Sequence, residues 1–142
     1  MIAVDTNLLV YAFNADAPQH AKARAALGHL AAGAAPWGLP QICVGQFLRV
    51  VTHRAFRPVV PLATAFSYLD LLLASPSVLL LVPTGRHLAL LRDVMAESGA
   101  AGVLVFDAQI VALCLEYGVR EILTADKDFR RFRGLKVTDP FA

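Results

Sequence analysis

The chain has 142 residues, of which 57% are hydrophobic, and its mean hydropathy is +0.57. This length predicts one domain over residues 1–142. No apolar run approaches the roughly 18 residues of a membrane span, so we assign the apolar excess to a large core and a face for a partner subunit. The formal net charge of +2 is too small to indicate a nucleic-acid-binding protein by itself.

The first apolar segment does not have the pattern of a signal peptide, because Asp5 and Asn7 interrupt it and no basic region precedes it. We therefore expect a cytoplasmic protein with no membrane contact. Cys43 and Cys114 both lie in apolar helical patterns. They are interpreted as buried thiols, and not as a disulfide or a metal-ligand pair.

The N-terminal segment predicts a strand that runs into a helix. Residues 2–4 form a short apolar run typical of a buried parallel strand, and residues 8–13 restart the apolar pattern with Thr6 or Asn7 as the helix cap. Asp5 lies at the junction, where open α/β sheets bind their ligands. It is either an ordinary turn or cap residue or part of a site at that edge.

The rest of the chain alternates between helical patterns and short apolar runs. The predicted helices span residues 20–30, 40 to about 53, 61 to a break at 75–77, 85–98, and 107 to a stop at 118. The predicted strands span residues 37–39, 78–82, 121–126 and 134–137, with a loop at 100–105 and a turn with a short helix at 126–132. Phe66 and Leu88 are among the side chains expected to face the core, and the strand at 78–82 is expected to be buried. This order predicts an α/β fold, a three-layer α/β/α sandwich around a short, mostly parallel sheet.

Four aspartates lie at boundaries between these elements, and each can face the same edge of the sheet. They are Asp5, Asp107, Asp126 and Asp128. Each one alone is most simply a cap or turn residue. Gathered in one pocket, however, carboxylates repel one another, and a hard divalent cation such as Mg²⁺ keeps them ionised. A water bound to such an ion is acidic enough to attack a phosphodiester.

Four short segments, taken in order, resemble the PIN-domain family, specifically the VapC-type toxins of toxin–antitoxin systems. They are Val4-Asp5-Thr6-Asn7, Phe47-Leu48-Arg49-Val50-Val51-Thr52, Asp107-Ala108-Gln109-Ile110, and Leu123-Thr124-Ala125-Asp126-Lys127-Asp128-Phe129. The resemblance covers essentially the whole chain and implies a PIN-like sandwich. It also implies an endoribonuclease dependent on Mg²⁺ or Mn²⁺ that cuts structured RNA. Such toxins are usually homodimers that a cognate antitoxin holds inactive.

The resemblance also assigns roles to residues of this chain. Asp5, Asp107 and Asp126 match the catalytic carboxylates that hold the metal. Asp128 matches a less regular extra acid, and Asn7 and Thr124 match polar residues that orient the ligands.

Basic residues gather after the central helix and near the C-terminus. Each cluster is interpreted either as a phosphate-binding surface or as a solvated surface that keeps an apolar protein in solution. The candidate RNA contacts among them are Arg49, Lys127, Arg130 and Arg131.

One position departs from the family pattern. The family carries a glutamate immediately before the aromatic residue of the second segment, and here Gln46 precedes Phe47. An amide has no negative charge and cannot act as a base at neutral pH, so metal affinity is expected to fall. The first hypothesis is a nuclease with a weakened site, and compensation by Asp128 is another outcome. The alternatives are an inactive module that binds RNA or antitoxin, and a phosphatase or DNA nuclease that uses the same carboxylates.

Overall fold

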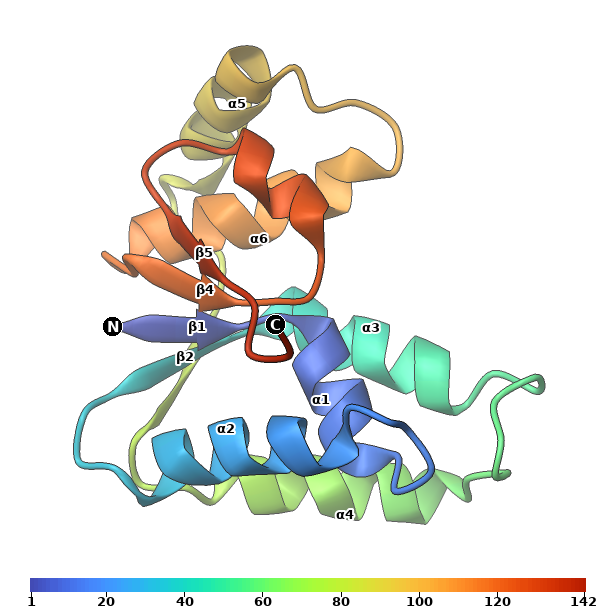
Figure 1. The fold of residues 1–142 in the computed structure, drawn as a ribbon. Coiled ribbons are helices and arrows are strands. Elements are labelled where there is room, and N and C mark those ends of the chain that lie inside the picture. The colour runs from blue at the N-terminus through green and yellow to red at the C-terminus, as the bar shows by residue number, and fades with distance from the viewer.

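The computed structural model describes residues 1–142 and contains one five-stranded sheet. Its strands are β1 (Ile2–Val4), β2 (Trp37–Pro40), β3 (Val78–Leu81), β4 (Glu121–Leu123) and β5 (Lys136–Thr138). They lie in the order β3-β2-β1-β4-β5, and every neighbouring pair is parallel (Figure 1). The sheet predicted as mostly parallel is therefore entirely parallel.

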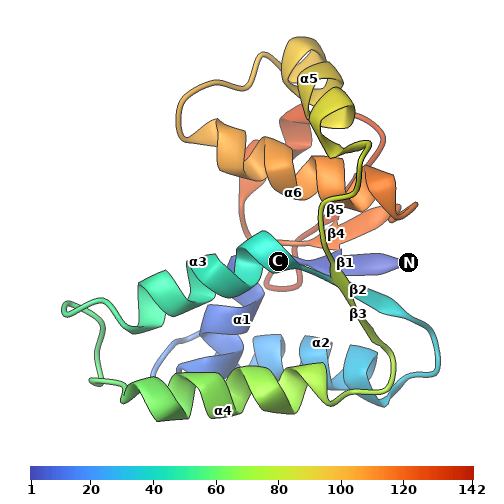
Figure 2. The ribbon, with the colours of Figure 1, turned by 180° about the vertical axis from the view of Figure 1, so that it is seen from behind.

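Helices cover both faces of this sheet. They are α1 (Thr6–Phe13), α2 (His20–Ala32), α3 (Gln41–Val51), α4 (Leu62–Leu73), α5 (His87–Ser98), α6 (Leu104–Glu116) and the short 3-10 helix η1 (Lys127–Arg131). Helices α5 and α6 lie on one side of the sheet and α1, α2 and α4 on the other (Figure 1). Seen from behind, α3 extends from the sheet between α6 and α4 (Figure 2). The predicted three-layer α/β/α arrangement is confirmed. None of the helices combines the length and the hydropathy of a membrane-spanning segment.

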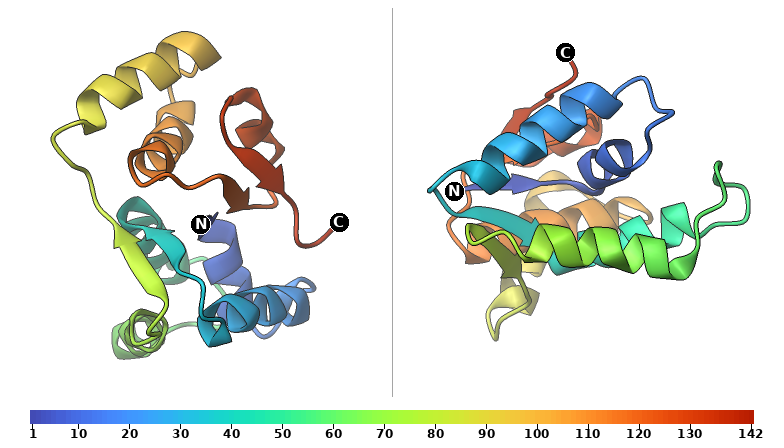
Figure 3. Two further views of the ribbon diagram at one scale, coloured as in Figure 1. Left: turned by 90° about the vertical axis from the view of Figure 1, so that its left-hand side faces the viewer. Right: turned by 90° about the horizontal axis from the view of Figure 1, so that it is seen from below.

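Strand β1 occupies the centre of the sheet and places the ends of distant segments next to each other. Val4 is paired with Leu123 of β4, and the backbone N–H of Asp5 donates to the carbonyl of Leu123 at 3.0 Å. Thr124, the first residue after β4, therefore lies beside Asp5. The left view in Figure 3, which looks along the strands, shows helices on both sides of this short central layer.

The hydrophobic core is a single cluster of 29 buried residues that includes residues of β1, β2 and η1. Trp37, Phe47 and Phe129 are among its largest fully buried side chains. Gly38 leaves room for the Leu81 side chain of β3, because a Cβ atom at Gly38 would lie 2.9 Å from a methyl carbon of Leu81. This packing holds the sheet edge that carries the aspartates on a rigid base.

Several local expectations were wrong. The cap of α1 is Asp5, and not Thr6 or Asn7. Helix α6 begins at Leu104, three residues before the predicted start, because Gly102 adopts a positive φ of 60° that turns the chain into the helix. The last strand begins at Lys136, and not at residue 134.

Two side chains expected in the core face solvent. Phe66 is 46% exposed and Leu88 is 69% exposed, although both fit an apolar helical stripe. Strand β3 is also less buried than predicted, because it lies at the edge of the sheet and leaves Leu79 39% exposed.

Candidate active site

Asp5 lies at the carboxyl end of the central strand and is almost fully buried, with 5% of its surface exposed. Its Oδ1 accepts a hydrogen bond of 2.6 Å from the backbone N–H of Thr6, and thereby caps α1. Its Oδ2 accepts from the side chains of Asn7 at 2.9 Å and Thr124 at 2.7 Å. The carboxylate is therefore held in one orientation by three donors, none of which carries a positive charge.

Asn7 and Thr124 form the bridge between α1 and the segment after β4. The Asn7 amide also donates to the Thr124 hydroxyl at 3.0 Å, and its carbonyl accepts from the backbone N–H of Ala125 at 3.2 Å. The Thr124 hydroxyl accepts from the backbone N–H of Asp126 at 3.0 Å. This network fixes the position of Asp126 relative to Asp5.

Three further carboxylates come together in front of this network. Oxygen atoms of Asp107, Asp126 and Asp128 all lie within 4.8 Å of one another. Asp107 stands in the first turn of α6, and Asp126 caps η1 by accepting a 2.8 Å hydrogen bond from the backbone N–H of Asp128. That turn brings Asp128 into the tightest carboxylate group, although the resemblance gave it only a supporting role.

Asp5 is outside this tightest group but faces the same cavity. The cavity has a volume of about 320 Å³ and opens at the carboxyl edge of the sheet. Its lining residues are Asp5, Thr6, Asn7, Val10, Tyr11, Gln46, Arg49, Val50, Asp107 and Asp126. Residues that are far apart in the sequence thus converge on one pocket.

The charges in this pocket are not balanced by the protein. The pKa of Asp107 is raised to about 7, first by burial and then by repulsion from the carboxylates of Asp126, Asp5 and Asp128. The charge of Arg131 opposes these effects only in part. None of the four acids takes part in a salt bridge.

The pKa of Asp5 is also raised. Burial is the largest cause, and the charge of Asp126 adds to it. The hydrogen bonds from Thr124, Thr6 and Asn7 favour the ionised form but do not offset the burial.

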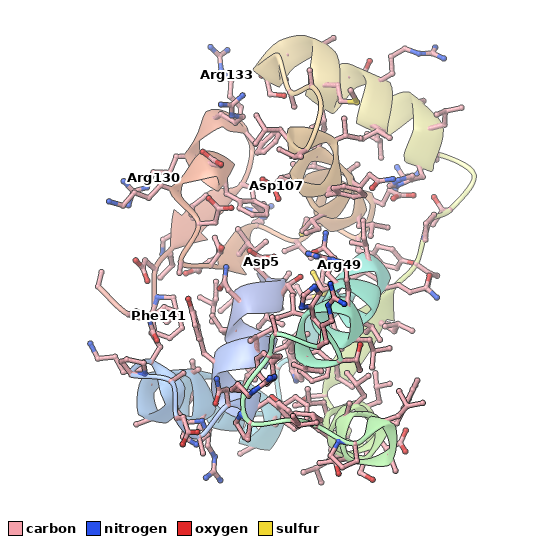
Figure 4. The ribbon with its side chains drawn as sticks, turned by 90° about the vertical axis from the view of Figure 1, so that its right-hand side faces the viewer. Asp5, Arg49, Asp107, Arg130, Arg133 and Phe141 are labelled. Carbon is pink, nitrogen blue, oxygen red and sulfur yellow. The ribbon has the colours of Figure 1, made fainter.

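The opposite wall of the cavity belongs to α3. The hydroxyl of Thr6 donates to Oε1 of Gln46 at 2.7 Å, and Arg49 follows one turn later on the same helix. Figure 4 shows Arg49 beside Asp5, with Asp107 nearby. Polar donors on α3 therefore face a group of carboxylates across the pocket.

The candidate RNA contacts divide into two sets. Arg49 lines the cavity, and Arg131 is close enough to influence Asp107. Lys127 and Arg130 are exposed on η1, and Arg130 points away from the pocket in Figure 4. Arg49 and Arg131 therefore lie near the carboxylates, whereas Arg130 lies away from them.

The residues present fit a divalent cation. The donor set consists of carboxylate oxygens, which are the ligands that Mg²⁺ and Mn²⁺ prefer. A cation at this position would also neutralise the repulsion that raises the pKa of Asp107. No histidine lines the cavity, and Cys43 reaches Asp5 only through a weak contact of 4.0 Å from its buried thiol, so a soft metal is not favoured.

Sequence reasoning missed two contacts of the site. The bond between Thr6 and Gln46 joins residues 40 positions apart, and no local pattern indicates it. The approach of Cys43 to Asp5 was also missed, because an apolar helical pattern shows that the thiol is buried but not which group it faces.

Known proteins are similar to this chain over most of its length. The family model described as PIN domain matches residues 2–135. The chain is 39% identical over 142 residues to a protein of Mycobacterium bovis named VapC ribonuclease Mb2897, covering 99% of this chain and 95% of that protein. It is 33% identical over 141 residues to Ribonuclease VapC25 of Mycobacterium tuberculosis, covering 99% of each chain.

One solved structure illustrates the similarity of fold. It is Mycobacterium tuberculosis VapC20, described as a sarcin-ricin loop cleaving toxin, with a TM-score of 0.69 at 17% identity over 96% of this chain and 99% of that one. At this level of identity the similarity concerns the fold, and it matches the PIN-like sandwich that the resemblance implied.

Proposed function

This chain belongs to the PIN-domain family, and on that premise we propose that it is a VapC-type toxin, a metal-dependent endoribonuclease that hydrolyses RNA phosphodiesters. The observation that carries the proposal is the group of three carboxylates within 4.8 Å at one edge of the sheet, next to Asp5, none of which forms a salt bridge. The names of the relatives, which are ribonucleases, support the same reaction class.

In this proposal the carboxylates hold the cation. Asp107, Asp126 and Asp5 are the proposed catalytic ligands, and Asp128 supports them from the same turn. Bound Mg²⁺ or Mn²⁺ would supply an acidified water and stabilise the negative charge that develops on the phosphate.

The other polar residues position the metal ligands or bind the RNA. Asn7 and Thr124 hold Asp5 and the segment of Asp126 in register, so that the ligands need little rearrangement. Arg49 and Arg131 attract the RNA phosphate to the cavity, and Lys127 and Arg130 extend that attraction along η1.

RNA cleavage tests the proposal directly. The purified protein with Mn²⁺ or Mg²⁺ is expected to cleave RNA, and EDTA is expected to stop the reaction. Asp107→Asn keeps the shape of the side chain but removes its charge, so cleavage should fall at least about a hundredfold. Asp93→Asn, an exposed position on α5, is the matched control and should cleave normally. Cleavage that survives Asp107→Asn would show that these carboxylates do not catalyse it.

A cognate antitoxin and a second copy of the chain are the proposed protein partners. The structure of VapBC2 from Rickettsia felis, bound to a DNA fragment from the promoter, has a TM-score of 0.68 to this chain, which covers 98% of that one at 18% identity. Large apolar side chains that such partners would cover are exposed here, among them Leu62 and Leu71 on α4 and Val103 before α6. Light scattering on the purified protein tests the dimer, because a monomer at micromolar concentration would contradict it.

We place the protein in the cytoplasm, and its two buried free thiols are consistent with a reducing compartment. The alternative function, a PIN fold that binds RNA or antitoxin without catalysis, makes a different prediction. It expects no Mn²⁺ binding in a calorimetric titration even at millimolar metal, whereas the nuclease requires that binding.

A further inference from the structure

The hydrogen bond between Thr6 and Gln46 orients the Gln46 amide. The Thr6 hydroxyl donates to Oε1 at 2.7 Å, so the carbonyl oxygen of the amide is turned toward the start of α1. The amide nitrogen, Nε2, makes no hydrogen bond within the protein. Because Gln46 is half-buried and lines the cavity, its two free N–H protons belong to the site.

Electrostatics favours the same orientation. The cavity contains the carboxylates of Asp5, Asp107 and Asp126, whose negative charges attract N–H groups and repel a carbonyl oxygen. The opposite orientation would turn Oε1 toward these charges and Nε2 toward the Thr6 hydroxyl. The amide is therefore held with its donor side toward the cavity.

Arg49 adds a second free donor to this wall. It lies three residues after Gln46, on the same face of α3, and it takes part in no salt bridge. Both side chains also line a neighbouring cavity of about 650 Å³, whose other walls are Ile42, Gly45, Val103 and Phe106. Gln46 and Arg49 thus lie between two neighbouring cavities and line both of them.

The free N–H groups of Gln46 and Arg49 lie across the cavity from the carboxylates that are proposed to hold the cation. A phosphodiester between them could accept hydrogen bonds from the N–H groups and face the cation. We infer that Gln46 binds the RNA, its Nε2 donating to a non-bridging oxygen of a backbone phosphate beside Arg49, and that Gln46 is not a metal ligand. The inference rests on the proposed function for the identity of the ligand. The family carries a glutamate at this position, and the amide of Gln46 was expected only to weaken metal binding. In this inference the amide also strengthens phosphate binding.

RNA binding and metal binding, measured separately, test this assignment. RNA affinity is measured with a fluorescein-labelled bacterial tRNA in EDTA, where no cleavage is expected. Mn²⁺ affinity is measured by calorimetric titration. Gln46→Met has nearly the same shape without the amide, so RNA affinity should fall about tenfold while Mn²⁺ affinity stays within about twofold. Gln41→Met, at an exposed glutamine on the same helix, should change neither quantity.

Two further variants make the test independent of a single substitution. Thr6→Val removes the hydroxyl that holds the amide, so RNA affinity should fall about threefold. Gln46→Glu should also weaken RNA binding, because a carboxylate repels phosphate, but it should tighten Mn²⁺ binding.

The opposite results would overturn the assignment. If Gln46→Met weakens Mn²⁺ binding and leaves RNA binding intact, Gln46 is a metal ligand. If it changes neither, Gln46 only spaces α1 from α3. The outcome is separable from the nuclease proposal, because a protein that binds RNA through Gln46 in EDTA yet never cleaves it would contradict only that proposal. Absence of RNA binding by the natural protein in EDTA would contradict the Gln46 assignment, and absence of both this binding and cleavage with Mn²⁺ would contradict both.

Discussion

Two acidic sites in this molecule, one at each end of α6, have opposite environments. At the far end of α6 from Asp107, the side chain of Glu116 is fully buried. Its carboxylate accepts hydrogen bonds from the backbone N–H of Thr84 at 2.9 Å and the Thr84 hydroxyl at 2.5 Å. It also pairs with Nδ1 of His87 at 2.7 Å. Burial pushes the pKa of Glu116 upward, but the hydrogen bonds from Thr84 and His87 outweigh it and lower the pKa.

Asp107, only nine residues earlier on the same helix, has no such partners. Its neighbours are other carboxylates, and burial together with their repulsion raises its pKa to about 7. Glu116 therefore joins the turn before α5 to α6 and needs nothing from outside the protein. Asp107 needs a cation that the protein does not supply, and that difference separates a structural acid from a candidate ligand.

The largest effect on the free energy of unfolding is expected at Glu116. Glu116→Gln removes the charge that Thr84 and His87 stabilise, and should lower the free energy of unfolding by about 2 kcal/mol. The loss should shrink as the pH falls below about 4.5, because the lowered pKa of Glu116 contributes stability only above the pKa of the unfolded chain. Urea denaturation at several pH values measures it. Glu97→Gln, which breaks only an exposed 3.7 Å pair with Arg133, should cost less than about 0.5 kcal/mol.

Asp5 is the intermediate case, since it has hydrogen-bond donors but no positive charge. Thr124→Val removes the hydroxyl that donates to Asp5 and accepts from the N–H of Asp126. Mn²⁺ affinity should fall about tenfold, because the two ligands lose their common support. Calorimetric titration measures the change, with Thr64→Val on the exposed face of α4 as control. Unchanged affinity would mean that the Thr124 hydroxyl does not position the ligands.

Removing an uncompensated charge should stabilise the metal-free protein. Asp107→Asn relieves the repulsion among the carboxylates, and because the side chain is half-buried, solvent screening limits the gain to about 1 kcal/mol, or about 3 °C in Tm. The raised pKa means that the folded protein binds this proton more tightly than the unfolded chain. The gain should therefore be complete above about pH 7 and vanish as the pH falls below the usual value of 3.8.

Thermal unfolding in EDTA at pH 8 measures this gain, with Asp93→Asn as control. A lower Tm for Asp107→Asn would mean that Asp107, like Glu116, is held by partners within the fold, and the comparison between the two acids would fail.

The sequence predicted the fold well because the signals for helices and parallel strands are local. Apolar runs before Asp5 and Thr124 indicated strands, and Gly118 ended α6 with a positive φ as expected. What it could not give was the order of the strands and the exposure of single side chains. Leu88 fits an apolar stripe, but which side of α5 is covered depends on how α5 packs against α6.

The site was predictable only as a list of residue types at strand and helix ends. The boundary positions of Asp107 and Asp126 are local features, and the parallel sheet brings such positions to one edge. The contacts that distinguish the two groups of acids are not local: Thr6 meets Gln46 across 40 residues, and His87 meets Glu116 across 29. Nothing in the pattern around Glu116 marked it as a buried acid.

The smallest expected effect concerns the protons that a cation must displace. Metal binds the ionised form of Asp107, and with its pKa near 7 that carboxyl is about half protonated at pH 7 in the metal-free protein. Apparent Mn²⁺ affinity should therefore fall only about twofold between pH 8 and pH 7. Titrations in buffers of different ionisation enthalpy should show release of about half a proton per ion at pH 7. In Asp107→Asn this release should disappear, and a release that persists would assign the titrating proton to another acid of the cluster.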